Sequence, residues 1–422
     1  MLSTLHSDSI NYLKTEQIKH MKKQLLFITL IACTILPLSG QKKNASARQS
    51  KTEEGYLFTP VVDLKATSVK NQSATGTCWC FATTSFIESE LLRTGKGEFD
   101  LSEMFVVRQN YVDRLKDNYL RRGKGNTGPG SLSHDWMRGF SEYGIVPDEI
   151  YPGLNYGSST HNHSELQAFI NAIAEVPVKR RNESKQYEEI VNAILNIYLG
   201  EYPESFTYKG VEYTPVSFAK SLNINPDDYV QITSFTHFPF YTRGILEVPD
   251  NWAMERFYNV PLDELIEIMD YSFNNGYTVN WDGDVSESGF SHKNGYAVLP
   301  LDQSGEKRPV TDRARLERTQ DQRSVIPEIT PSPGPEINVT QEIRQGGYEN
   351  FTTTDDHLMH LTGVVKDQNG TKYYKTKNSW GTDRNAFGGY LNMSESYVRA
   401  KTLFIMVNKN GIPPAIKTKL GI

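Results

Sequence analysis

The sequence predicts an α+β fold, because helical patterns fill its first half and strand patterns gather toward its C-terminal end. Apolar residues recur at spacings of three and four in four segments, about 78–93, 102–120, 131–142 and 164–193. Strand-like runs occupy 229–233, 278–281, 358–365 and 371–377. The connection between the last two runs ends in Asn369-Gly370, a dipeptide typical of β-hairpins.

The composition is that of a globular protein. The 422 residues are 38% apolar and 23% charged, and the formal net charge is -5. This charge offers no chain-wide basic surface, so we expect no nucleic-acid partner. Only 3 Cys are present, which excludes a disulfide scaffold. Because Cys and His do not recur in pairs at ligand spacing, we predict no metal site and no cofactor.

The N-terminal region, 1–40, reads as an extension followed by an export signal. Met21-Lys22-Lys23 precedes an apolar run over 25–38 that is short for a membrane span. We predict a start at Met21, cleavage near Gly40, and no transmembrane span in the exported mature chain. Two alternatives remain open: a single anchoring helix, and a lipid anchor at Cys33, whose surroundings resemble a bacterial lipoprotein processing site. Residues 41–55 form a flexible linker, and the folded body begins near Tyr56.

The segment around Cys78 has the features of a thiol nucleophile site. A Cys on the first turn of a helix lies beside unsatisfied N–H groups and the positive end of the helix dipole, which favours thiolate. The Gln72 amide, carried back by a turn at Gly76, would stand beside the Cys78 N–H as a second oxyanion donor. Cys80 projects about 200° away on a helix and is expected to pack inward.

A general base is expected from the far end of the chain. His357 begins one strand of the hairpin, and Asn378 ends the other, so the two side chains can be hydrogen-bonded neighbours. Asn378 would orient the imidazole, His357 would act as general base and acid, and Trp380 would shield their bond from water. His360 is a rival base, but its side chain should point to the opposite face of the strand. Three further histidines lie in polar stretches and are expected to be solvated, His161, His163 and His292.

Gln72, the Gly76-Thr77-Cys78-Trp79 box, Asp356-His357 and Asn378-Ser379-Trp380-Gly381 together resemble papain-like cysteine peptidases. This resemblance implies a helical left lobe, a β-rich right lobe and peptide substrates, and it covers about 56–409. Two departures stand out. Thr75 replaces the Cys that papain relatives use for a disulfide, and the His lies far beyond the usual ~130–150 residues after the nucleophile.

The departures favour the branch of bleomycin hydrolase and aminopeptidase C. The resemblance to this branch implies helical insertions, here at about 160–275 and 296–340, and a ring-shaped homohexamer. It also implies a C-terminal arm, here 410–422, whose terminal carboxylate at Ile422 meets the substrate amine. The expected activity is therefore that of an aminopeptidase. Gly128 and Gly130 would let the cleft backbone approach an extended substrate, and Trp380 would also line the cleft.

Three other functions remain open from the sequence. A papain-like endopeptidase would use the same residues without an arm that sets the cleavage register. An acyltransferase of transglutaminase type would pass the acyl group to an amine instead of water. A non-catalytic protein would use the cleft only to hold peptides.

Overall fold

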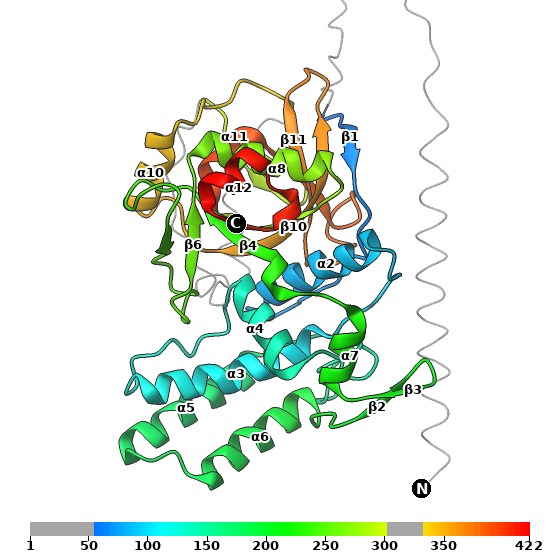
Figure 1. The fold of residues 1–422 in the computed structure, drawn as a ribbon, viewed down its shortest axis with the longest axis vertical. Helices are drawn as coiled ribbons and strands as arrows, with labels where there is room; N and C mark the ends of the chain where they lie inside the picture. Colours follow the sequence, from blue (N-terminus) through cyan, green and yellow to red (C-terminus); the bar gives the residue numbers. More distant parts are fainter. Residues whose placement is uncertain (1–54, 302–331) are drawn as a thin grey trace, which may run out of the picture. The chain divides into compact units, whose positions relative to one another are not determined.

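The computed structural model describes residues 55–301 and 332–422 (Figure 1). The expected export signal, Cys33 and nearly all of the linker at 41–55 lie outside the described residues, as does most of the expected insertion at 296–340. Of the helices in the two described ranges, none combines the length and the apolar character that crossing a bilayer requires.

The helices of the first half follow the sequence patterns closely. They are α2 (Cys78–Arg93), α3 (Glu103–Leu120), α4 (Ser133–Tyr143), α5 (Ser164–Arg180), α6 (Lys185–Leu199) and α7 (Pro215–Leu222). The Ser102 hydroxyl caps α3 by accepting from the Phe105 N–H at 3.0 Å. Figure 1 shows α3, α5 and α6 packed side by side below α2, which separates them from the sheet. These helices with the short hairpin of β2 (Phe206–Tyr208) and β3 (Val211–Tyr213) form a helical lobe.

The second half builds a mostly antiparallel sheet, which has eleven strands in the described part of the chain. Its order is β5-β6-β4-β13-β7-β10-β11-β12-β9-β8, and β1 pairs with β10. The strands are β1 (Thr59–Asp63), β4 (Tyr229–Thr233), β5 (Arg243–Ile245), β6 (Arg256–Asn259), β7 (Val279–Gly283), β8 (Phe290–Ser291), β9 (Tyr296–Ala297), β10 (His357–Lys366), β11 (Lys372–Lys377), β12 (Tyr390–Ser394) and β13 (Thr402–Asn408). The expected α+β fold, helical in one lobe and β-rich in the other, is confirmed.

The predicted hairpin connects β10 and β11. The Asp367 carboxylate accepts from the backbone N–H groups of Asn369 and Thr371, each at 2.9 Å. Gly370 takes a positive φ of 84°, which glycine adopts without a steric penalty. The turn therefore fixes the register that brings the start of β10 near the end of β11.

The sheet has a hydrophobic core on each face. Along β10, Leu358 packs with α2 and the helical lobe, whereas Met359 packs on the other face with α8 (Leu262–Asn274). Phe404 and Ile405 of β13 divide in the same way. This alternation follows from the two-residue period of a strand. We name these sides the α2 face and the α8 face of the sheet.

The region expected as an insertion, about 160–275, contributes to both halves. Its first part, through α7, lies with the helices, but β4, β5 and β6 belong to the main sheet and α8 covers the α8 face. Two further helices, α10 (Gln341–Glu349) and α11 (Glu395–Lys401), pack against each other near the end of the chain.

The C-terminal residues, expected as an arm over 410–422, include a short helix. After a 3-10 turn over Lys409–Gly411, residues Pro414–Leu420 form helix α12, and both Ile416 and Leu420 are buried in the core of the α8 face. Lys419 reaches Glu264 of α8 with a 2.6 Å ion pair. The apolar side chains of the expected arm, 410–422, thus pack into a core (Figure 1, beside the C label).

Candidate functional site

Cys78 is the first residue of α2, as the sequence indicates. Thr77 precedes it without capping the helix through its side chain, and the first turn carries no acidic residue. The positive end of the helix dipole is therefore not neutralised locally, which suits a thiolate at this position. Cys78 is 4% exposed, so its sulfur is shielded from bulk water.

The Gln72 side chain forms two hydrogen bonds, one as donor and one as acceptor. Its Nε2 donates to the Thr75 carbonyl at 2.9 Å, and its Oε1 accepts from the Ser379 hydroxyl at 2.6 Å. The Gln72 backbone N–H also donates to the Ser379 carbonyl at 2.8 Å. These contacts fix the amide orientation, because Oε1 can only accept, and they leave the second Nε2–H for another acceptor.

His357 and Asn378 form the predicted hydrogen bond. The distance from His357 Nε2 to Asn378 Oδ1 is 2.8 Å, and the Ser379 backbone N–H donates to the same oxygen at 2.7 Å. An amide oxygen can only accept, so the proton of the neutral imidazole lies on Nε2 and Nδ1 keeps its lone pair. This is the tautomer that a base toward a neighbouring thiol requires.

The structure adds His292 behind Asn378. The Asn378 amide donates from Nδ2 toward His292 Nδ1 at 3.4 Å, opposite to its bond with His357. Burial lowers the pKa of His292 to about 4, with a smaller contribution from Arg384, so the ring is neutral at physiological pH and can accept. The expectation that His292 is solvated was wrong: its polar neighbours are exposed or half-buried, but the ring itself lies inside.

Trp380 covers this pair, as expected. Its ring lies 4.9 Å from the His357 ring at an interplanar angle of 31°, and 5.1 Å from the His292 ring in an edge contact. The indole therefore shields the His357–Asn378 bond from water, which strengthens it.

The glycine segment around Pro129 lies against the Cys78 loop. A Cβ added at Gly76 would stand 2.6 Å from Pro129 Cγ, so only glycine fits there. The Trp79 indole donates to the Pro129 carbonyl at 3.1 Å. Pro129 thus contacts Gly76 and Trp79, the residues on either side of Thr77 and Cys78. Gly128 and Gly130, which we predict to contact the substrate through their backbones, flank Pro129.

Two other expectations for side chains are confirmed. Cys80 is buried and its sulfhydryl donates to the Glu103 carbonyl at 3.2 Å, and burial raises the pKa of this thiol well above its ordinary value. His360 faces Ser85 of α2, with 2.9 Å between Nδ1 and Oγ. Burial lowers its pKa well below the ordinary range, so this ring stays neutral.

His161 and His163 lie next to the Cys78 loop. We expected both to be solvated, but His161 is half-buried and His163 is buried. The His161 carbonyl accepts from the Ala74 N–H at 3.0 Å, and the His163 N–H donates to the Ala74 carbonyl at 3.1 Å. His163 is buried, and burial lowers its pKa to about 3. These backbone bonds support the loop that carries Gln72.

Ile422 packs on the core of the α8 face together with α12, whereas Cys78 begins the helix that covers the α2 face. The contact expected between the terminal carboxylate and the substrate amine stays a prediction.

Within the two described ranges, no group of three or more His, Cys, Asp or Glu side chains is arranged to hold a metal ion. The arrangement of a thiol at a helix start, a tethered glutamine amide and a histidine oriented by an asparagine suits nucleophilic acyl transfer.

The chain resembles known proteins over most of its length. A model of the papain family cysteine proteases matches residues 61–250, and one of the peptidase C1-like family matches 347–421. Aminopeptidase C of Streptococcus thermophilus is 23% identical over 88% of this chain and 86% of its own. The mitochondrial cysteine proteinase 1 of Saccharomyces cerevisiae is 21% identical over 87% of this chain and 80% of its own.

Among solved structures, PepW from Lactobacillus rhamnosis HN001 superposes with a TM-score of 0.63 at 18% identity, covering 86% of this chain and 84% of that one. This likeness shows a shared fold. The two family models match residues on both sides of the undescribed segment. The chain is a cysteine peptidase that belongs to the papain-like family, on the branch that contains aminopeptidase C.

Proposed function

We propose that this peptidase cleaves peptides through a thioester on Cys78, with His357 as general base and acid. The observation that carries the proposal is the 2.8 Å bond from His357 Nε2 to Asn378 Oδ1, which leaves Nδ1 for the thiol. Gln72, held between Thr75 and Ser379, supports the assignment of its amide as an oxyanion donor.

The proposed reaction has two steps. In the first, His357 removes the Cys78 proton, and the sulfur attacks the peptide carbonyl carbon. The oxyanion accepts hydrogen bonds from the Cys78 backbone N–H and Gln72 Nε2. His357 returns its proton to the departing amine as the C–N bond breaks. In the second step His357 takes a proton from water as the water oxygen attacks the thioester carbonyl. The C–S bond then breaks, the carboxylic acid is released, and His357 returns the proton to the Cys78 sulfur.

We propose cleavage at the substrate's N-terminus as the main mode. This rests on similarity to a protein named aminopeptidase C over most of both chains. Endopeptidase cleavage is the second candidate, because Ile422 packs on the core of the α8 face.

One experiment tests both the chemistry and the mode. Wild-type protein and Cys78→Ala are incubated with one peptide whose N-terminus is free or acetylated, and the products are mapped by mass spectrometry. We expect stepwise N-terminal release from the free peptide, and no hydrolysis by Cys78→Ala. Internal cuts in both peptides would select the endopeptidase, and hydrolysis by Cys78→Ala would refute the role of the thiol.

We further propose export, on the basis of the basic start at Met21 and the apolar run over 25–38, and assembly into a homohexamer, on the basis of the family branch. N-terminal sequencing of the secreted protein tests the first. Light scattering of the purified mature chain tests the second, and a monomer at micromolar concentration would refute it.

A further inference from the structure

Asp250 lies directly against the glycine segment beside Cys78. A Cβ built on Gly130 would stand 2.0 Å from Asp250 Oδ2 and 2.7 Å from Oδ1, so the carboxylate occupies the space where a side chain at position 130 would project. Position 130 immediately follows Pro129, which contacts Gly76 and Trp79. A carboxylate therefore stands on the wall of the cleft, close to the backbone that an extended substrate would follow.

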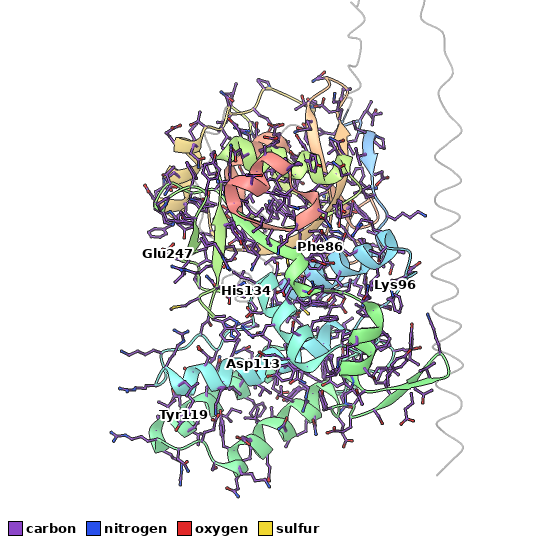
Figure 2. The ribbon with its side chains drawn as sticks, viewed as in Figure 1. Phe86, Lys96, Asp113, Tyr119, His134 and Glu247 are labelled. Atoms are coloured by element: carbon purple, nitrogen blue, oxygen red, sulfur yellow. The ribbon has the colours of Figure 1, made fainter. Side chains whose placement is uncertain are left out.

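Arg114 and Asp135 are the charged groups that act on Asp250. Arg138 pairs with Asp135 at 2.9 Å and lies 3.7 Å from Asp113, which is labelled on α3 in Figure 2. The remaining cation is Arg114, which binds backbone carbonyls, donating from Nε to Asn126 at 2.8 Å and from Nη1 to Gly130.

Asp250 itself is only weakly compensated. Within residues 55–301 and 332–422, the structure gives its carboxylate no hydrogen bond and no ion pair within 4.0 Å. Burial raises the pKa of Asp250 to about 6, an effect that Arg114 opposes and Asp135 reinforces. The carboxylate is therefore largely charged at neutral pH, and a cationic hydrogen-bond donor would stabilise it.

We propose that Asp250 binds the ammonium group of the substrate, and thereby sets where the chain is cut. This inference rests on the proposed peptidase function. An ammonium group is the complementary partner for a partly buried carboxylate whose facing cation, Arg114, lies beyond ion-pair distance. From its place beside Gly130, Asp250 supplies the negative charge that recognition of the substrate's N-terminus requires.

The ammonium has two possible sources, the substrate's N-terminus or a lysine side chain near it. If the first residue of the substrate lies beside Gly130, its N-terminal ammonium group binds Asp250. A lysine side chain would reach the same carboxylate if the peptide continued past it.

Binding measurements separate these sources without requiring catalysis. The background is Cys78→Ala, and the variants are Asp250→Asn and, as a matched control, Asp227→Asn at an exposed site near β4. Calorimetry measures the Kd of three peptides, Ala-Phe-Ala-Ala with a free N-terminus, its acetylated form, and acetyl-Lys-Phe-Ala-Ala.

Asp250→Asn should weaken binding of the free peptide by about 10- to 100-fold, the loss expected for one charge-assisted hydrogen bond. The acetylated peptide should change by less than about twofold, as should all peptides with Asp227→Asn. A loss confined to the lysine peptide would assign the ammonium to a side chain. Equal losses for all three peptides, or none for any, would overturn the proposal.

The test also separates this inference from the proposed function. If the wild type cleaves peptides while Asp250→Asn binds all three normally, the peptidase assignment stands and the ammonium site fails. If Asp250 discriminates free from acetylated peptides but Cys78→Ala retains hydrolysis, the ammonium site stands and the thiol mechanism fails. Binding of the free peptide should also weaken as pH falls through about 6, where Asp250 becomes neutral.

Discussion

Replacing Asn378 by alanine should slow the enzyme by disorienting His357. The substitution removes the 2.8 Å bond from His357 Nε2 and leaves the Ser379 N–H, now 2.7 Å from Asn378 Oδ1, without its acceptor. A hydrogen bond to a neutral partner contributes about 0.5–1.5 kcal/mol and one to a charged partner about 1.5–3 kcal/mol. The bond therefore stabilises the imidazolium more than the neutral ring, by about 1–1.5 kcal/mol.

Two measurable effects follow for Asn378→Ala. kcat/KM should fall by about 10- to 100-fold, because an imidazole that rotates away cannot exchange protons with Cys78. The alkaline limb of the pH–rate profile should move to lower pH by about one unit, since 1.36 kcal/mol corresponds to one unit. The assay is hydrolysis of an aminoacyl coumarylamide between pH 5 and 10.

Asn369→Ala is the matched control, because it lies at the turn of the same hairpin, at the opposite end from His357. It should leave both the rate and the pH profile unchanged. If Asn378→Ala kept kcat/KM within twofold of the wild type and an unchanged alkaline limb, the role of Asn378 in orienting His357 would be refuted.

The remaining predictions address the parts around this pair. His292→Leu removes the acceptor for Asn378 Nδ2 and should lower kcat about 3- to 10-fold with little change in KM. His292→Gln should recover part of this loss. Equal rates in the wild type and both variants would show that His292 does not contribute to catalysis. Gly130→Ala should reduce kcat/KM more than Gly128→Ala, because its Cβ would overlap the Asp250 carboxylate, whereas a Cβ at 128 meets only Asn126 Oδ1 at 3.1 Å. Ile416→Ala should lower the free energy of unfolding by about 2–5 kcal/mol, as measured by urea denaturation, because it leaves a cavity in the core. Peptide mapping should show unchanged cleavage products. A change of products at unchanged stability would favour a C-terminal arm that lies in the cleft.

The sequence predicted the reacting groups because their chemistry is local. The helix start at Cys78 and the hairpin signal at Asn369-Gly370 define their own geometry. The register of the hairpin then places His357 near Asn378, and this does not depend on how the long region between Cys78 and His357 folds. The lobes and most helix bounds follow from periodicity for the same reason.

The features that the sequence did not predict depend on contacts between residues far apart in the sequence. Asp250 sits in a polar loop, and only its packing on Gly130 from far along the chain gives it a role. His292 lies among polar residues, and Trp380 buries it. The C-terminal helix did have a local signal, in Pro414 at the first helical position and in Ile416 and Leu420 four residues apart.

The most direct test of the thiol mechanism is the pH dependence of iodoacetamide modification at Cys78, mapped by mass spectrometry beside residual activity. We predict that Cys78 reacts well below the free-thiol value of about 8.5, that activity falls in proportion, and that Cys80 stays unmodified. Modification of Cys78 only above about pH 8.5, or full activity after complete modification, would contradict Cys78 as the activated nucleophile.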